Sequence, residues 1–208
     1  MKVVVIDTET TNNIDEPICY DMGWAVIDTD TWEVVKTRSF AVAEVFLDKP
    51  FMALAYFAEK IPQYWDEIKS HKRTLARLST IYFALRNDCK EYEVAAIYAH
   101  NARFDWLSAT LTQRLVTCSK YRYFFPYGVE VRDTLSMARE VFNHDEDYIN
   151  FCVNNDYFTA RGQKRFTAEI LYRFLSNDNE FIEEHKGIDD VLIEKEILRA
   201  CWERGVKE

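Results

Sequence analysis

The first ten residues constrain the fold of this chain more than any other stretch. Residues 3–6 are Val-Val-Val-Ile, a β-branched run without polar alternation. Such a run is typical of a strand that is buried on both faces of a sheet. The run ends on two acids, Asp7 and Glu9, which share one strand face with Val3 and Val5 because side chains alternate between faces. We therefore expect two carboxylates at the C-terminal end of a central strand, where open α/β sheets bind ligands.

This Asp-x-Glu pair suits a divalent cation. Hard cations prefer carboxylate oxygens, and two adjacent carboxylates repel each other unless a positive charge neutralises them. A strand that simply runs out into a polar loop is the alternative explanation. The buried run before the pair favours the metal site.

Composition predicts one globular domain over residues 1–208. Hydrophobic residues make up 48% of the chain and aromatic residues 15%, with only five Gly and four Pro and no linker-like tract. The five cysteines are an odd number without a Cys-x-x-Cys pair, which favours a reducing compartment over disulfides or a zinc site. No signal segment or membrane-length apolar run is present, so we expect a cytoplasmic protein without a membrane partner.

The formal net charge of −9 is unusual for a protein that binds nucleic acid. Acids that bind cations would account for part of this charge. Basic residues concentrate in two places: Lys120 and Arg122 with Tyr121 and Tyr123 interleaved, and then Arg161, Lys164 and Arg165. From spacing alone, a path for nucleic acid and an ordinary solvated surface both remain open.

Periodicity predicts an α/β fold with a mixed five-stranded sheet flanked by helices. After the opening strand, the predicted elements are strands at Gly23–Ile27, Glu33–Val42, Val94–Ala99 and Glu130–Leu135, and a helical region over about Pro50–Asn87 that breaks near Pro62. The first two of these strands form a hairpin through the turn at 28–31. The helical region has no predicted chemical role. Asn101 and Asp105 follow the strand at 94–99, so we expect them at another C-terminal strand end.

The last predicted helix, which runs to about Trp202, carries two adjacent aspartates. At 100° per residue Asp190 falls inside the apolar arc, whereas Asp189 falls on the opposite, charged face. A buried carboxylate is costly unless it is paired or binds a cation, so Asp190 is the functional candidate. Glu194 also lies inside the arc, and the sequence assigns it no role.

His185 precedes Asp190 by five positions. On one continuous helix the two side chains would diverge by about 140°. We therefore place His185 in the loop before the helix, with Gly187 loosening the chain so that the ring can reach the same site. A histidine beside carboxylates suits proton transfer near neutral pH, although a surface histidine before a helix is the simpler alternative.

These segments together resemble the DEDDh exonucleases, a ribonuclease-H-like group that includes proofreading subunits of replicative DNA polymerases. The segments that carry the resemblance are Asp7-Thr8-Glu9, His100–Asp105, Asp133-Thr134-Leu135, and His185 with Asp190. Lys186 occupies the position of the tyrosine in the related tyrosine-bearing branch, so the histidine branch fits. Many members carry Ala at the position of Gly187. The helical insert before Val94 and the segment Thr159–Glu169 resemble those of small phage-encoded members.

The resemblance implies a metal-dependent 3′-to-5′ exonuclease that removes nucleoside 5′-monophosphates from single-stranded or frayed DNA ends. It implies that two Mg²⁺ or Mn²⁺ ions are held by Asp7, Glu9, Asp105 and Asp190. It also implies that His185 activates water and that the terminal nucleotide is seated by Thr8, Asn101 and Phe104, although Phe104 also suits the core. Two cations about 3.5–4 Å apart can stabilise both the attacking and the leaving oxygen at phosphorus.

Alternatives remain open at this stage. The same residues are compatible with an exoribonuclease, and the sequence does not separate DNA from RNA as the substrate. A catalytically idle nucleic-acid-binding or assembly module of the same fold is an alternative from a different functional class. A polymerase partner is compatible with the resemblance, but no polymerase-binding tail is recognisable, so a proofreading role does not follow.

Overall fold

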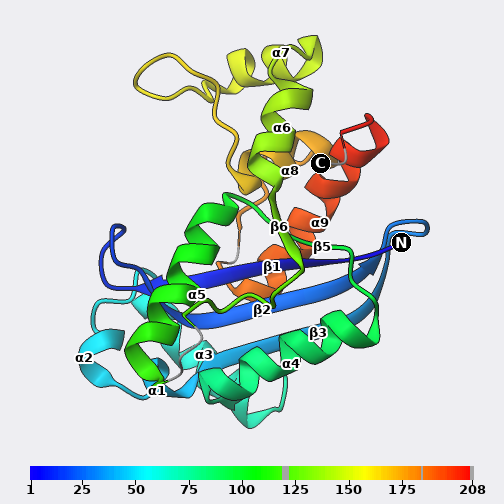
Figure 1. Ribbon diagram of the computed structural model, residues 1–208. Helices are drawn as coiled ribbons and strands as arrows, with labels where there is room; N and C mark the ends of the chain where they lie inside the picture. The colour runs from blue at the N-terminus through cyan, green and yellow to red at the C-terminus, as the bar shows by residue number, and fades with distance from the viewer. Residues whose placement is uncertain (119–121, 184, 207–208) are drawn as a thin grey trace.

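A six-stranded mixed sheet forms the centre of the molecule (Figure 1). The computed structural model describes residues 1–118, 122–183 and 185–206. The strands, in chain order, are β1 (Lys2–Thr11), β2 (Ile18–Asp28), β3 (Glu33–Val42), β4 (Thr74–Ala76), β5 (Ala96–Ala99) and β6 (Glu130–Asp133). Their order across the sheet is β4-β3-β2-β1-β5-β6. β1, β2 and β3 form an antiparallel meander, and the other three strands pair in parallel with their neighbours.

Helices cover the sheet, and residues 134–176 form a lobe beside it (Figure 1). They are α1 (Ala43–Phe46), α2 (Lys49–Met52), the 3₁₀ helix η1 (Ala58–Lys60), α3 (Ile61–Lys69), α4 (Leu78–Glu91), α5 (Ala102–Val116), α6 (Thr134–Phe142), α7 (Glu146–Asn155), α8 (Ala168–Ser176) and α9 (Gly187–Glu203). One apolar cluster joins the sheet to α3, α4 and α5, and a second joins the opposite face to α6, α8 and α9.

β1 takes part in both clusters, as its sequence predicts. Val4 and Ile6 pack in the α5-side cluster, whereas Val3 and Val5 pack in the α9-side cluster, and none of the four is exposed. Burial of each such side chain contributes about 1.5–3 kcal/mol relative to exposure. The alternation continues beyond Ile6, so that successive polar side chains of β1 also point to opposite faces.

The strand count and several boundaries differ from the predictions. The predicted five-stranded sheet gains β4, a three-residue strand inside the region predicted as helical, which pairs in parallel with the end of β3. Three residues are too few to show a strand period. β2 begins at Ile18 and not at the predicted Gly23, because its pairing with β1 continues to the Thr11–Ile18 pair. β5 begins at Ala96, two residues after the predicted start. β6 ends at Asp133, whose side chain accepts a hydrogen bond from Leu135 N and caps α6.

Two predictions about the chain as a whole can be compared with the structure. All five cysteines are free thiols, and four of them are buried. Within the described residues, no helix is both long and apolar enough to cross a bilayer.

Candidate active site

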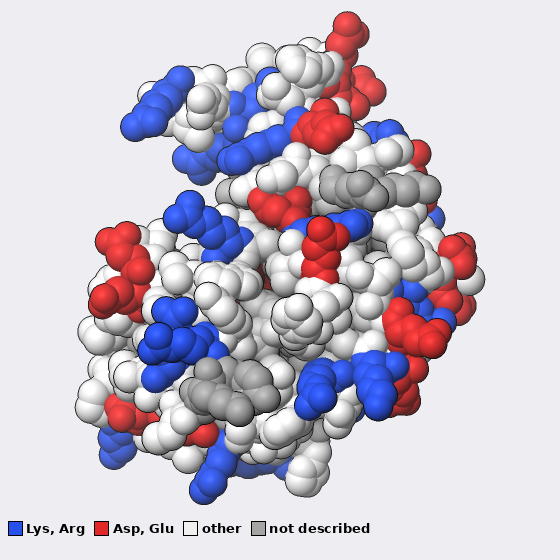
Figure 2. All heavy atoms as spheres, viewed as in Figure 1, with Lys and Arg blue, Asp and Glu red and all other residues white. Residues whose placement is uncertain are grey.

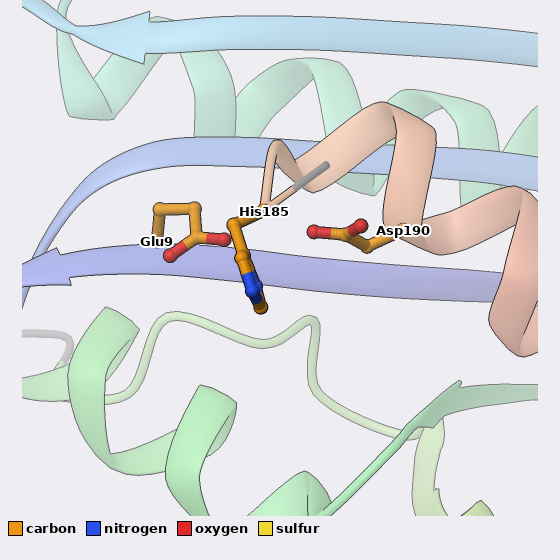
Figure 3. Close-up of side chains that lie close together, drawn as sticks. All are labelled: Glu9, His185 and Asp190. Atoms are coloured by element: carbon orange, nitrogen blue, oxygen red, sulfur yellow. The ribbon is translucent and has the colours of Figure 1, made fainter. Parts of the chain in front are cut away.

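Four predicted carboxylates converge from three elements. Asp7 and Glu9 lie on β1, Asp105 lies in the first turn of α5, and Asp190 lies in the first turn of α9. Glu9, Asp105 and Asp190 are 9%, 2% and 3% exposed, and the half-buried Asp7 lines a cavity of about 620 Å³. Figure 3 shows the carboxylates of Glu9 and Asp190 pointing toward each other, with His185 between them. The structure therefore brings together residues that are far apart in the sequence.

Thr8 connects β1 to α5 at this site. Its side chain points to the face opposite Asp7, where Oγ1 donates a hydrogen bond of 2.8 Å to Oδ1 of Asp105. Oγ1 of Thr8 also lies 3.0 Å from Oγ of Ser108. Thr8, predicted to seat the terminal nucleotide, is buried, and its side chain holds the Asp105 carboxylate in place.

Two glycines allow α9 to reach the sheet. Gly23 of β2 pairs with Asp7, and Gly187 is the first residue of α9. A Cβ atom on Gly187 would lie 2.8 Å from Gly23 N, and one on Gly23 would lie 2.4 Å from the carbonyl carbon of Gly187. Gly187 was expected to loosen the chain, but it is helical and buried, and its function is this close backbone contact. Asp190, three residues further along α9, is thereby brought to the end of β1.

A buried ion pair holds the first turn of α9. Oδ2 of Asp21 in β2 accepts hydrogen bonds from Gly187 N (3.1 Å) and from the Tyr64 hydroxyl (2.7 Å). Oδ1 of Asp21 accepts a hydrogen bond from Nη1 of Arg73, whose side chain is fully buried. Burial lowers the pKa of Arg73 to about 10. The region at 50–87, which had no predicted role, thus supplies Tyr64 and Arg73 to position α9.

His185 occupies the loop before α9, as predicted, and its backbone is left-handed with φ of 49°. Its ring stacks on Phe57, with centroids 4.2 Å apart and an interplanar angle of 10°. Nδ1 of His185 lies 3.9 Å from Oε2 of Glu183. Phe57 immediately precedes η1, where Nζ of Lys60 lies 5.8 Å from the Phe57 ring centroid. The insert at 50–60 therefore forms one wall of the site, which periodicity did not indicate.

Burial, and after it the charges of neighbouring acids, raises the pKa of each clustered carboxylate. Burial, followed by the charges of Asp190 and Glu183, raises the pKa of Glu9 to about 8. Burial, followed by the charge of Glu183, also raises the pKa of Asp190 to about 8, and burial raises that of Asp105 to about 7. For Asp7 the pKa lies well above its usual value, again chiefly because of burial. The cluster therefore binds protons readily near neutral pH unless a cation neutralises it.

Two further acids belong to the same cluster. Glu194, which the sequence placed inward without a role, is 3% exposed, and its Oε2 accepts a hydrogen bond of 3.2 Å from His100 N. Burial, followed by the charge of Asp105, raises the pKa of Glu194 well above its usual value. Glu183 has a pKa raised to about 7 by burial and then by Glu169. Glu183 lies in an irregular segment, so no periodic signal could have identified it.

The donor set fits a hard divalent cation. Glu9, His185 and Asp190 each offer a ligand atom, and these atoms lie within 4.8 Å of one another. Oδ2 of Asp190 accepts a hydrogen bond of 2.8 Å from Lys186 N. Oδ1 of Asp190 is buried and has no hydrogen-bond partner among the described residues. A buried acceptor without a donor, set among other carboxylates, is what an oxygen-ligated cation requires.

The remaining predicted residues occupy two different settings. Asn101 is exposed, lines the 620 Å³ cavity, and has a left-handed backbone whose N–H donates to Oδ1 of Asp133 (2.9 Å). Phe104 is half-buried and lies outside the two described apolar clusters. Asp133 also caps α6, so its observed contacts join α5 and α6.

Comparison with known proteins gives structural matches only. No protein-family model and no curated protein match the sequence. The nuclease domain of 3′hExo, a DEDDh family member bound to rAMP, matches with a TM-score of 0.61 at 13% identity, over 99% of this chain and 94% of that chain. A 3′-exonuclease that recognises the 3′ end of a histone mRNA stem-loop matches with a TM-score of 0.65 at 11% identity, over 99% of this chain and 65% of that chain.

A third match is the zinc-bound complex of E. coli ExoI with single-stranded DNA. Its TM-score is 0.64 at 14% identity, over 98% of this chain and 41% of that chain. This chain therefore spans less than half the length of that enzyme. At such identities the likeness concerns the fold, and it confirms the predicted α/β architecture. The chain has the fold of the DEDDh-family 3′-exonucleases.

Proposed function

We propose that this protein is a metal-dependent 3′-to-5′ exonuclease that releases nucleoside 5′-monophosphates from single-stranded or frayed DNA ends. The observation that carries the proposal is the convergence of four carboxylates from β1, α5 and α9, with an Asp190 oxygen that has no hydrogen-bond partner within the described residues. The likeness in fold to three exonucleases supports the same reaction class.

Asp7, Glu9, Asp105 and Asp190 would hold two Mg²⁺ or Mn²⁺ ions. When bound, such a pair activates water and stabilises the negative charge that develops on the attacking and leaving oxygens. Carboxylate oxygens are the preferred ligands of both cations. In this proposal, Thr8 fixes the orientation of Asp105 through its hydrogen bond of 2.8 Å.

His185 acts as the general base in this proposal. Its imidazole takes a proton from the attacking water, the new P–O bond forms, and the bond from phosphorus to the 3′ oxygen of the preceding nucleotide breaks. That oxygen takes up a proton and becomes the new 3′-hydroxyl. The Phe57 ring, stacked at 4.2 Å, limits the orientations of the imidazole, and Glu183 at 3.9 Å can stabilise the imidazolium.

The terminal nucleotide occupies only the part of the 620 Å³ cavity that lies beside Asp7 and Asn101. In this proposal Asn101 and Phe104 contact the nucleotide, and Thr8 contributes through Asp105. RNA is the second candidate substrate, because the structural neighbours include a histone mRNA stem-loop complex as well as one with single-stranded DNA. An idle binding module of the same fold is the alternative to an enzyme.

A degradation assay tests these alternatives. Single-stranded DNA, duplex DNA and RNA of matched sequence, labelled at the 5′ end, are incubated with Mg²⁺, Mn²⁺ or EDTA. We expect a ladder that shortens by one nucleotide at a time with either cation, and no cleavage in EDTA or by Asp105→Asn. Full activity in EDTA would contradict the metal site. Cutting of covalently closed circular strands would identify an endonuclease, and binding without any cleavage would identify the idle module.

A further inference from the structure

The segment between α7 and α8 is positively charged, although the chain as a whole is acidic. The sequence contains 35 acidic and 26 basic residues, yet residues 157–168 carry Arg161, Lys164 and Arg165 and no acid. This segment projects from the lobe, drawn in yellow at the upper left of Figure 1. Figure 2 shows Lys and Arg gathered on the projecting part, above a hollow in the surface. An anionic partner is the natural complement of such a segment.

The segment is a hairpin whose two arms are joined by backbone hydrogen bonds. Phe158 and Lys164 form an antiparallel bridge, and Thr159 N donates a hydrogen bond of 2.8 Å to the carbonyl oxygen of Gln163. The turn uses Gly162, whose φ of 72° favours glycine. At the base, Nε2 of the half-buried His100 ring lies 2.7 Å from Phe166 O. His100 directly follows β5, so the hairpin is fastened to the sheet beside the carboxylates.

One cavity joins this hairpin to the carboxylates. The 620 Å³ space that Asp7 and Glu194 line is also lined by Lys164 and Arg165 of the hairpin and by Arg139 of α6. A strand that enters with its 3′ end at the carboxylates would carry its preceding phosphates past these cations. Phosphate contacts to Lys and Arg supply affinity without selecting a base sequence.

We propose that residues 157–166, together with Arg139, form a phosphate-binding arm that holds the backbone of a single nucleic-acid strand upstream of its 3′ end. The proposal rests on the proposed exonuclease function and adds the position of the strand. It also makes activity depend on strand length, because a very short strand ends before it reaches the arm. The other basic cluster is described only in part, since Lys120 and Tyr121 lie outside the described residues.

The test compares two charge-removing variants. Arg161→Gln/Lys164→Gln removes two arm cations but keeps Arg165, because its Nε donates to Phe158 O and supports the hairpin. Arg86→Gln/Lys90→Gln makes the same change at exposed positions of α4. Cleavage of a 15-nucleotide strand and of a dinucleotide is measured in the presence of Mg²⁺, at salt concentrations from about 50 to 200 mM. Binding of the labelled 15-mer is followed in parallel by fluorescence anisotropy in EDTA.

We expect the arm variant to lose on the order of tenfold more kcat/KM on the 15-mer than on the dinucleotide. Its salt slope for binding should fall by about 1.4, since each single-strand phosphate contact contributes about 0.7. The α4 variant should keep the wild-type values. Equal losses of kcat/KM on both substrates, or an unchanged salt slope of binding, would contradict the phosphate-binding arm. Cleavage by the wild-type protein would still support the nuclease function. Wild-type protein that cleaves neither substrate would overturn the nuclease, and the anisotropy slopes would still show whether the arm binds the strand.

Discussion

The stack between Phe57 and His185 shows how a single apolar side chain can position a residue of the proposed catalytic centre. Phe57 contributes no acid, base or ligand, yet it fixes one face of the imidazole at 4.2 Å. A side chain that is one-third exposed, as His185 is at 34%, would otherwise sample several rotamers. Phe57 is therefore a positioning residue for the proposed general base.

Phe57→Ala should lower kcat by roughly 10- to 100-fold with little change in KM, because a displaced base loses proton transfer more than binding. His185→Ala sets the limit at about 10²–10⁴-fold. Phe57→Tyr should restore most of the activity, since it keeps the ring. Steady-state kinetics on a labelled single strand provide the measurement, with Leu54→Ala, at a 59% exposed position of the same insert, as the control. An increase in KM alone would assign Phe57 to the nucleotide pocket.

The two adjacent aspartates of α9 provide a matched pair for testing the cation site. Asp190 is 3% exposed, and one of its oxygens has no donor in the part of the chain that the structure describes, whereas the side chain of Asp189 is 47% exposed. Asp190→Asn should abolish Mn²⁺ binding in calorimetry and cleavage in the ladder assay, and Asp189→Asn should change both little. Similar Mn²⁺ affinity in both variants would show that Asp190 is not a ligand.

At the scale of elements, the site depends on how closely α9 approaches β2. The contact is between backbones, so neither side can give way by changing a rotamer. Asp21 strengthens the approach, because it accepts the Gly187 N–H while it pairs with the buried Arg73. A displacement of α9 would move Asp190 relative to Asp7 and Glu9 and so disrupt the proposed cation site.

Gly23→Ala should destabilise the protein by about 1–3 kcal/mol, the usual cost of overpacking. Its Cβ would lie 2.4 Å from the carbonyl carbon of Gly187, so α9 must shift and cleavage should fall as well. Urea unfolding and kcat give the two readouts. Ser39→Ala, at the position that pairs with Gly23 on β3, tests for a general effect on the strands. Wild-type stability in Gly23→Ala would mean that the contact is looser than the backbone distances indicate.

The elements that sequence predicts well are those marked by a local pattern, either a continuous apolar run or a helical period. The apolar run of β1 and the helical phase of α9 were enough to place Asp7, Glu9 and Asp190. The Asp21–Arg73 pair and the Phe57–His185 stack had no such signal, because each depends on partners far apart in the chain. β4 has no local signal for the same reason, since a three-residue strand is defined by its pairing with β3.

For the whole molecule, the raised carboxylate pKa values predict how stability depends on pH. Glu9 and Asp190 titrate near 8 and Asp105 near 7 in the fold, whereas unfolded carboxylates titrate near 4. The folded state therefore binds more protons than the unfolded state between about pH 4 and 8. The contribution of these groups is full below pH 4 and is lost as pH rises through 7 to 8.

In EDTA, Tm should therefore fall between pH 5 and 8, and Glu9→Gln should make this fall shallower. Added Mg²⁺ competes with protons for the same oxygens, so it should raise Tm most at pH 8. Thermal unfolding at three pH values, with and without Mg²⁺, measures both effects. A slope that is equally steep in wild type and Glu9→Gln would contradict the assignment of the proton uptake to this cluster.

The position of β1 between two apolar clusters has a consequence for how the molecule opens. Asp105 extends from the helix layer on one face of the sheet and Asp190 from the layer on the other. A cation shared by them would fasten the two layers, which could otherwise open separately. A cation present at 100 times its Kd stabilises the folded state by about 2.7 kcal/mol. Mn²⁺ should therefore slow amide hydrogen exchange in α5 and α9 together. In the proposed enzyme, the same cations would then also join two separately opening parts of the fold into one cooperative unit.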